Sequence, residues 1–206
     1  MKILGVCGSH RKSGGTYRLL EEAMRGVKEE DQAIDTRIVE LSGLKISPCI
    51  ATCGYGDGVG CAKNPFECNV KDDLQIVFEE MKQADGVLIA SPRYFIVPSK
   101  LQAFIERVYC SSFWSFQRNP SMLSPLANKP FGILTTSSSD AYSAIPLQEH
   151  LEKFLLWLQM SPVTVKKWPF RGVHGQFPIP EDTSALELAR QLGREIVSAV
   201  RNRKQS

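Results

Sequence analysis

The feature that most constrains this chain is a regular alternation between short apolar runs and longer segments with helical periodicity. The run KILGVCG at residues 2–8 is almost entirely apolar and ends in glycine, which is typical of a buried parallel strand. In residues 16–30 the apolar side chains recur at the spacing of one helical face. The alternation continues, and we expect further strands at 35–41, 86–90, 131–135 and 162–167, and further helices at 72–83, 100–110, 147–160 and 183–201. Five strands alternating with five helices predict an α/β fold with a parallel sheet covered on both faces.

Composition and charge exclude several classes of partner. A chain of 206 residues with 43% hydrophobic residues, and with no internal repeat or linker, is expected to form one domain over residues 1–206. The net charge of +3 is slight, and the basic residues form no stripe, so we expect no nucleic-acid partner. No apolar run is long enough to span a bilayer, which favours a cytoplasmic chain with no membrane partner. Thiols stay reduced in the cytoplasm, so structural disulfides are not expected.

Three loops follow the carboxyl ends of the expected strands, where open parallel sheets bind their ligands: residues 8–15, 91–98 and 135–143. The first, GSHRKSGGT, offers hydroxyl groups, glycine amides and the free N–H groups of a helix start, a combination that suits phosphate. It contains neither the Gly-Lys-Ser/Thr of a P-loop nor the G-x-G-x-x-G of a dinucleotide site. A phosphatase built on Cys7 would need an arginine where Ser13 stands, so we interpret Cys7 as a small apolar residue of the sheet. The loop is therefore interpreted as a site for a terminal monophosphate.

Three segments, GSHRKSGGT, ADGVLIASPRYF and LQAFIERV, carry a resemblance to a known family. Over roughly residues 1–140 the chain resembles the flavodoxin-like NAD(P)H-dependent FMN reductases, and among them the iron–sulfur flavoproteins. The resemblance implies a doubly wound, five-stranded flavodoxin-like domain that binds FMN, with a cysteine-containing insertion at residues 47–71 after the second strand. It also implies the residues that bind FMN, one group in each loop: Ser9, Arg11, Ser13, Gly14, Gly15 and Thr16; Pro92, Arg93, Tyr94 and Phe95; and Thr136, Ser137 and Ser138.

The second loop carries the residues expected to tune the flavin. A cation near the N1 and C2 carbonyl of the reduced ring raises the potential of the cofactor, and Arg93 is the candidate for that role. Alternatively, Arg93 pairs with a nearby acid or points to solvent. Tyr94 and Phe95 either contact the ring or are ordinary packing residues. Hydride transfer to a flavin needs positioning more than acid–base chemistry, and we identify no catalytic side chain in the sequence.

Four of the six cysteines fall in residues 49–68, in the connection after the second expected strand. In the iron–sulfur flavoproteins this connection carries a compact four-cysteine motif, and the resemblance implies a [4Fe–4S] cluster held by Cys49, Cys53, Cys61 and Cys68. The spacing here is looser than the family motif. A structural zinc ion and a loop of reduced, unligated thiols are therefore the alternatives.

These observations lead to three functional hypotheses. The first is a cytoplasmic FMN-dependent oxidoreductase that couples FMN to a [4Fe–4S] cluster, with NAD(P)H, ferredoxin or a quinone as redox partner. The second is an NAD(P)H-dependent FMN or quinone reductase without a cluster, and the third is a non-catalytic, zinc-stabilised flavin-binding module. In relatives the cluster of one subunit faces the flavin of another, so the resemblance implies a homodimer or homotetramer.

Overall fold

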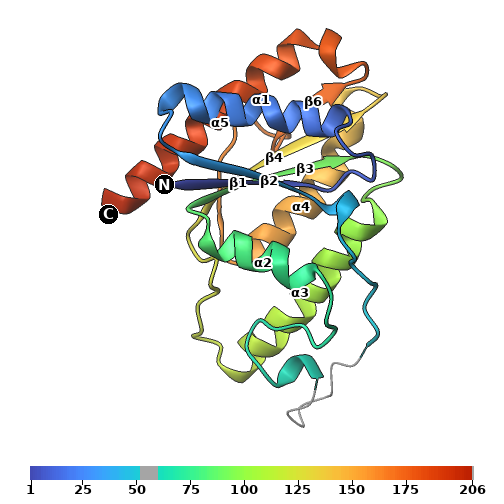
Figure 1. The fold of residues 1–206 in the computed structure, drawn as a ribbon, viewed down its shortest axis with the longest axis vertical. Helices are drawn as coiled ribbons and strands as arrows, with labels where there is room; N and C mark the ends of the chain where they lie inside the picture. Colours follow the sequence, from blue (N-terminus) through green and yellow to red (C-terminus); the bar gives the residue numbers. More distant parts are fainter. Residues whose placement is uncertain (52–59, 206) are drawn as a thin grey trace.

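The computed structural model describes residues 1–51 and 60–205 and is drawn in Figure 1. Its strands are β1 (Lys2–Cys7), β2 (Asp35–Glu40), β3 (Gly86–Pro92), β4 (Pro130–Ser137), β5 (Ser161–Pro162) and β6 (Val173–Gln176). Its α-helices are α1 (Gly15–Glu30), α2 (Leu74–Gln83), α3 (Ser99–Arg118), α4 (Ile145–Trp157) and α5 (Thr183–Gln205). Short 3-10 helices occur at η1 (Leu41–Gly43), η2 (Gly60–Ala62), η3 (Ala141–Ala144) and η4 (Ile179–Glu181). None of the described helices is both long and apolar enough to cross a membrane.

The strands form one parallel sheet in the order β2-β1-β3-β4-β5. This is the doubly wound order of flavodoxin-like folds, in which the chain reverses its direction of winding between β1 and β3. The two central strands β3 and β4 are buried along their whole length, because helices cover both of their faces. The fold class expected from the sequence is confirmed.

The fifth position of the sheet differs from the expectation of one strand at 162–167. β5 ends at Pro162 and pairs with the beginning of β4, whereas β6 pairs with the end of β4 at residues 134–137. Between them Thr164 turns the chain, since its hydroxyl oxygen accepts a hydrogen bond from the N–H of Lys166 at 3.2 Å. The predicted strand is therefore wrong beyond Pro162, and two short strands share its place.

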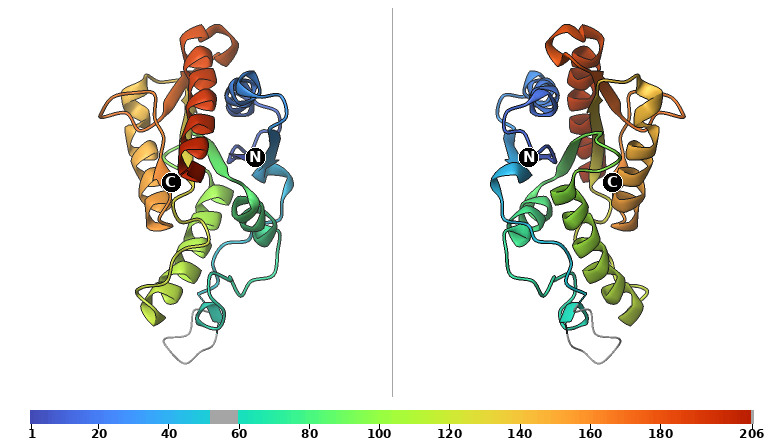
Figure 2. Two further views of the ribbon diagram at one scale, coloured as in Figure 1. Left: turned by 90° about the vertical axis from the view of Figure 1, so that its left-hand side faces the viewer. Right: turned by 90° about the vertical axis from the view of Figure 1, so that its right-hand side faces the viewer.

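The helices form two layers, one on each face of the sheet (Figures 1 and 2). α1 and α5 cover one face and enclose an apolar core of their own, and α2, α3 and α4 enclose a second core on the opposite face. α1 and α5 pack at backbone distance. A Cβ added at Gly26 would lie 2.0 Å from the carbonyl oxygen of Arg190, and one at Gly193 would lie 1.9 Å from that of Ala23. Only glycine permits so close an approach.

Helix α3 extends well past the 100–110 expected from the sequence. Its second half carries serines whose hydroxyls bond back to the preceding turn, as Ser115 does to the carbonyl of Ser111 at 2.8 Å. Aromatic rings fix this half against α4, with the rings of Phe116 and Trp157 5.6 Å apart. The longer helix reaches beyond the sheet, and residues 60–70 lie beside its far half (Figure 1).

Candidate functional site

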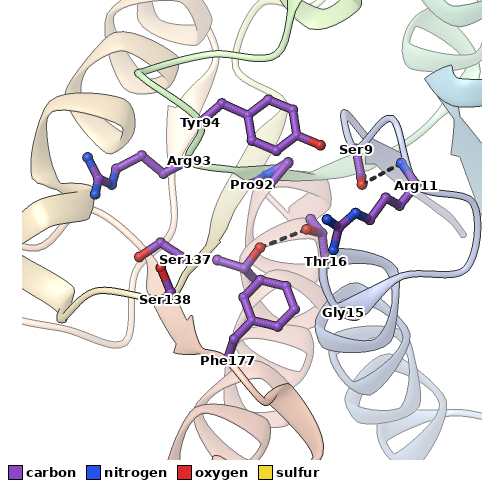
Figure 3. A pocket seen from close by; sticks show the side chains of 11 residues that line it. Ser9, Arg11, Gly15, Thr16, Pro92, Arg93, Tyr94, Ser137, Ser138 and Phe177 are labelled. Carbon is purple, nitrogen blue, oxygen red and sulfur yellow. Dashed lines mark hydrogen bonds between the residues drawn. The ribbon is translucent and has the colours of Figure 1, made fainter.

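The loops after β1, β3 and β4 meet at the carboxyl edge of the sheet around a cavity of about 310 Å³ (Figure 3). Ten of the thirteen residues that the sequence assigns to FMN line this cavity, and the structure adds an aromatic ring, that of Phe177. Two of the lining residues are arginines and none is acidic, so the described lining favours an anion. The lining consists of Ser9, Arg11, Gly15, Thr16, Pro92, Arg93, Tyr94, Thr136, Ser137, Ser138 and Phe177.

The first loop has a conformation that leaves the start of α1 open. The Ser9 hydroxyl oxygen accepts a hydrogen bond from the Arg11 N–H at 3.0 Å, and the Ser13 N–H donates to Glu40 Oε2 at 2.9 Å. Gly14 stands at the N-cap position and has no side chain to cap the helix, and no acidic residue stands in the first turn. The first N–H groups of a helix lack intrahelical partners and carry partial positive charge, so this terminus is suited to an anionic group.

A hydroxyl pair joins the first loop to the third. The Oγ1 atoms of Thr16 and Thr136 lie 2.7 Å apart, and both side chains are buried. The pair stands at the base of the cavity, where Figure 3 shows Thr16 pointing from α1 toward β4. Each threonine hydroxyl has one hydrogen and two lone pairs, so the pair keeps further hydrogen-bonding capacity for a ligand.

Arg93 in the second loop is held with part of its guanidinium unused. The backbone N–H of Arg93 donates to the carbonyl of Thr136 at 2.7 Å, and the side-chain Nη2 donates to Ser139 Oγ at 3.2 Å. Its Nε atom is buried and finds no hydrogen-bond partner within the described residues. Among the described residues, Arg93 also forms no ion pair with an acid. Figure 3 shows this guanidinium on the opposite side of the cavity from Arg11.

Three of the sequence-assigned residues do not line the cavity. Phe95 points into solvent, 91% exposed, although its neighbour Tyr94 lines the cavity and stacks on His10 with ring centroids 5.8 Å apart. Ser13 and Gly14 line an adjacent hollow instead, together with Gly15 and Phe177. The residues of the first loop therefore divide between two neighbouring surfaces.

Sequence reasoning missed two functional candidates that come from β6 and the residue after it. A Cβ added to Gly15 would lie 2.5 Å from the Phe177 ring, so that ring presses directly on the start of α1. His174 Nε2 lies 3.1 Å from the Ser139 carbonyl, and its Nδ1 lies 3.1 Å from the Thr135 hydroxyl. The only sequence signal for either is the alternating segment VHGQ, which is too short to indicate a strand by itself.

Burial sets the protonation state of two residues near the cavity. It lowers the pKa of His174 and keeps the imidazole neutral at pH 7. A carbonyl can only accept, so Nε2 carries the proton toward Ser139, and Nδ1 accepts from the Thr135 hydroxyl. Burial also raises the pKa of the Cys7 thiol to about 11. Cys7 is therefore a protonated residue of the sheet and not a nucleophile.

The cysteine-containing connection is only partly described. Cys61 and Cys68 are buried and Cys49 is half-buried, whereas Cys53 lies outside the described residues. Within residues 1–51 and 60–205, no three histidine, cysteine or acidic side chains lie close enough together to hold a metal ion. The predicted four-cysteine site accordingly stays a prediction.

An ion pair between Asp72 and the buried Arg107 of α3 closes the base of this connection, with Nη1 to Oδ2 at 2.6 Å. Burial would raise the pKa of the Asp72 carboxyl, but hydrogen bonds from Arg107 and from the N–H groups of Ser47 and Leu74 outweigh it, and the pKa lies below its ordinary value. Burial would likewise lower the pKa of Arg107, but its hydrogen bonds to Asp72 and Cys68 raise it. Both groups are therefore charged at pH 7.

Comparisons with known proteins agree with this geometry. A family model described as NADPH-dependent FMN reductase matches residues 1–175. An iron–sulfur flavoprotein of Methanocaldococcus jannaschii is 28% identical over 98% of each chain. Among solved structures, RosB with a bound 8-demethyl-8-formylriboflavin-5'-phosphate intermediate superposes with a TM-score of 0.71 at 17% identity, covering 100% of this chain and 81% of its own. A flavodoxin, WrbA-like protein from Agrobacterium tumefaciens superposes with a TM-score of 0.62 at 16% identity, over 98% of both chains. At these identities the two superpositions show the shared fold.

Proposed function

The chain belongs to the NADPH-dependent FMN reductase family, and from that membership we propose that it is an FMN-dependent oxidoreductase that exchanges electrons between FMN and a [4Fe–4S] cluster. The observation that carries the proposal is the cavity at the carboxyl edge of the sheet. It combines an open helix start, two arginines and several hydroxyls without an acidic group in its described lining. The iron–sulfur flavoprotein from M. jannaschii supports the second cofactor, because its similarity covers the cysteine-containing connection as well as the flavin site.

The residues of the cavity fit FMN. The start of α1, with Ser9, Arg11 and Thr16, would hold the phosphate, since it offers N–H and O–H donors next to a cation. The buried, unpartnered Nε of Arg93 is a donor that a ligand can satisfy. Pro92 and Tyr94 add apolar surface for a ring.

A bound FMN would accept hydride and would pass on electrons one or two at a time. The chain contributes binding and electrostatics. Arg93 places positive charge at the cavity, and this charge would stabilise the negative charge of a reduced flavin and so would raise the reduction potential of the cofactor. The neutral His174 donates a hydrogen bond to the carbonyl of Ser139, and the hydroxyl of Ser139 accepts one from Arg93. The third loop therefore keeps the Arg93 cation in position.

The cysteine-containing connection fits an iron–sulfur cluster by its donor chemistry. Cys49, Cys53, Cys61 and Cys68 provide the four thiolates that such clusters take, and glycines allow a tight wrap around them. Two of these thiols are buried, which shields a cluster from solvent. We propose NAD(P)H, the substrate of the family, or ferredoxin as electron donor, with a quinone as an alternative acceptor and a homodimer or homotetramer as the assembly.

The test is to purify the chain without oxygen and to measure flavin, iron, sulfide and zinc on one sample, with its visible spectrum. The proposal expects about one FMN, and about four irons with matching sulfide per chain. Cys68→Ser should lose iron, whereas Cys110→Ser, on α3 outside the connection, should retain it. Flavin without iron, reduced by NAD(P)H, would support a plain flavin reductase. A zinc-loaded chain that NAD(P)H does not reduce would support a non-catalytic module instead.

A further inference from the structure

Arg107 is a fully buried cation in the middle of α3, and each of its five N–H donors has an acceptor within residues 1–51 and 60–205. Nη1 donates to Asp72 and to the carbonyl of Ser47 at 3.0 Å, and Nη2 donates to Asp72 and to the carbonyl of Val70 at 2.9 Å. The remaining donor, Nε, points at the sulfur of Cys68, 3.2 Å away. A planar guanidinium satisfied in this way has a single orientation.

These acceptors stand at both ends of the cysteine-containing connection. Ser47 precedes Cys49 by two residues, and Val70 and Asp72 follow Cys68. Asp72 Oδ2 also accepts the N–H of Ser47 at 2.8 Å, which ties the two ends to each other. Arg107 thus holds both ends of the connection against α3, because it binds Ser47 at one end and Val70 and Asp72 at the other.

Cys68 lies beside an ion pair of one cation, Arg107, and one anion, Asp72. The positive charge of Arg107 is matched by Asp72, and its Nε–H is directed at sulfur rather than at an oxygen. Metal ligation makes that sulfur an anion, and a hydrogen bond from a cation to an anion is about twice as strong as a neutral one. Adding an electron to a cluster adds negative charge, so a cationic donor to a ligating sulfur favours the reduced state and raises the potential.

We propose that Arg107 is the positioning residue of the cluster site: it fixes Cys68 as a ligand and raises the reduction potential of the cluster through an N–H···S hydrogen bond. This inference rests on the proposed function, in which Cys68 binds iron. It assigns to a residue of α3, 39 positions away from the cysteine, a part in setting the direction of electron flow.

The test compares wild type with Arg107→Lys and Arg107→Gln after anaerobic reconstitution with iron and sulfide. Lysine keeps the charge without the planar fork, and glutamine keeps a donor without the charge. The matched control is Arg118→Gln, because Arg118 donates from the same helix to a backbone oxygen of the same connection, the carbonyl of Lys63, whereas Arg107 donates to the sulfur of Cys68. FMN content reports on folding, since the flavin cavity has no lining residue in common with this site.

The readouts are iron per chain and the midpoint potential of the cluster in a one-electron titration with dithionite. We expect Arg107→Gln to shift the reduction equilibrium about tenfold toward the oxidised cluster, about 59 mV for one electron. Arg107→Lys should shift it less, and Arg118→Gln should leave it at the wild-type value. Full iron loading with an unchanged potential in both Arg107 variants would overturn the inference.

If the Arg107 variants fail to fold, the N–H···S hydrogen bond can be tested in protein that keeps Arg107. In protein made with arginine labelled with ¹⁵N in the guanidinium, the reduced cluster should show a ¹⁵N coupling by pulsed electron paramagnetic resonance, and Arg118→Gln should preserve it. Absence of the coupling in an iron-loaded chain would refute the N–H···S bond. A wild-type chain that takes up no iron would overturn the proposed cluster itself, and this inference with it.

Discussion

The hydroxyl pair between Thr16 and Thr136 allows a structural role to be separated from a ligand-binding one. The two Oγ1 atoms lie 2.7 Å apart and both side chains are buried. Thr16→Val removes one hydroxyl with little change of shape and leaves the other without its partner, which should cost the flavin-free protein about 1–3 kcal/mol of stability. Replacing both threonines by valine removes both polar groups, so the double variant should lose less than the sum of the two single variants.

FMN affinity should follow a different pattern in the same set of proteins. If Thr16 donates to the phosphate, both variants that lack its hydroxyl should bind FMN about 10- to 100-fold more weakly, because a hydrogen bond to a charged group contributes about 1.5–3 kcal/mol. Urea unfolding of the apo-protein measures the stabilities, and quenching of FMN fluorescence measures the affinity. Thr36→Val, the same change in β2, is the control and should alter neither. Unchanged FMN affinity in Thr16→Val would refute the phosphate assignment, and additive losses of stability would refute the hydroxyl pair.

Three further predictions concern the same cavity. Arg93→Met should lower the midpoint potential of bound FMN, because it removes the cation that stabilises the reduced flavin; a potential at the wild-type value would contradict this role. Gly15→Ala should weaken FMN binding and cost about 1–3 kcal/mol of stability, because its Cβ would meet the Phe177 ring at 2.5 Å. Gly43→Ala is the control and should be neutral in the same two assays, because a Cβ there would meet no atom of the described residues within 4 Å. Folding lowers the pKa of His174 below its unfolded value near 6.5. The stability that the neutral imidazole contributes is therefore complete above pH 6.5 and is lost as the pH falls through 6.5 toward the folded pKa. The difference in unfolding free energy between wild type and His174→Gln should accordingly shrink from pH 7 to pH 5, and a constant difference would argue against a neutral, buried imidazole.

The sequence was sufficient for the central sheet and for the edge at which the three loops meet, because both depend on local signals, whereas the individual FMN-binding residues come from the family resemblance. β1, β3 and β4 are nearly continuous apolar runs, and the chain places their carboxyl ends together whatever the details of the loops. The three loops that follow were therefore predicted to meet, and they do so around one cavity.

The parts that could not be predicted depend on contacts between distant segments. Phe177 reaches the cavity because β6 pairs with the end of β4, and a four-residue strand with a central glycine gives too weak a signal for that pairing. The second half of α3 contains serines and aromatic residues of modest helix propensity, and it is helical because α4 and the cysteine-containing connection pack against it. The role of Arg107 likewise depends on acceptors at Ser47 and Asp72, which only the folded chain brings to one guanidinium.

The glycine-to-backbone packing of α1 against α5 has a consequence for how the protein is made. α5 follows all the described strands in the sequence, yet it covers one face of the sheet together with α1 and fits α1 with no space for a side chain at Gly26 or Gly193. At about 5–20 residues per second, its 23 residues take about 1–5 s to synthesise, and during that time the apolar face made by α1, β1 and β3 has no cover. A nascent chain stalled before Thr183 should therefore bind holdase chaperones, and the emergence of α5 should release it.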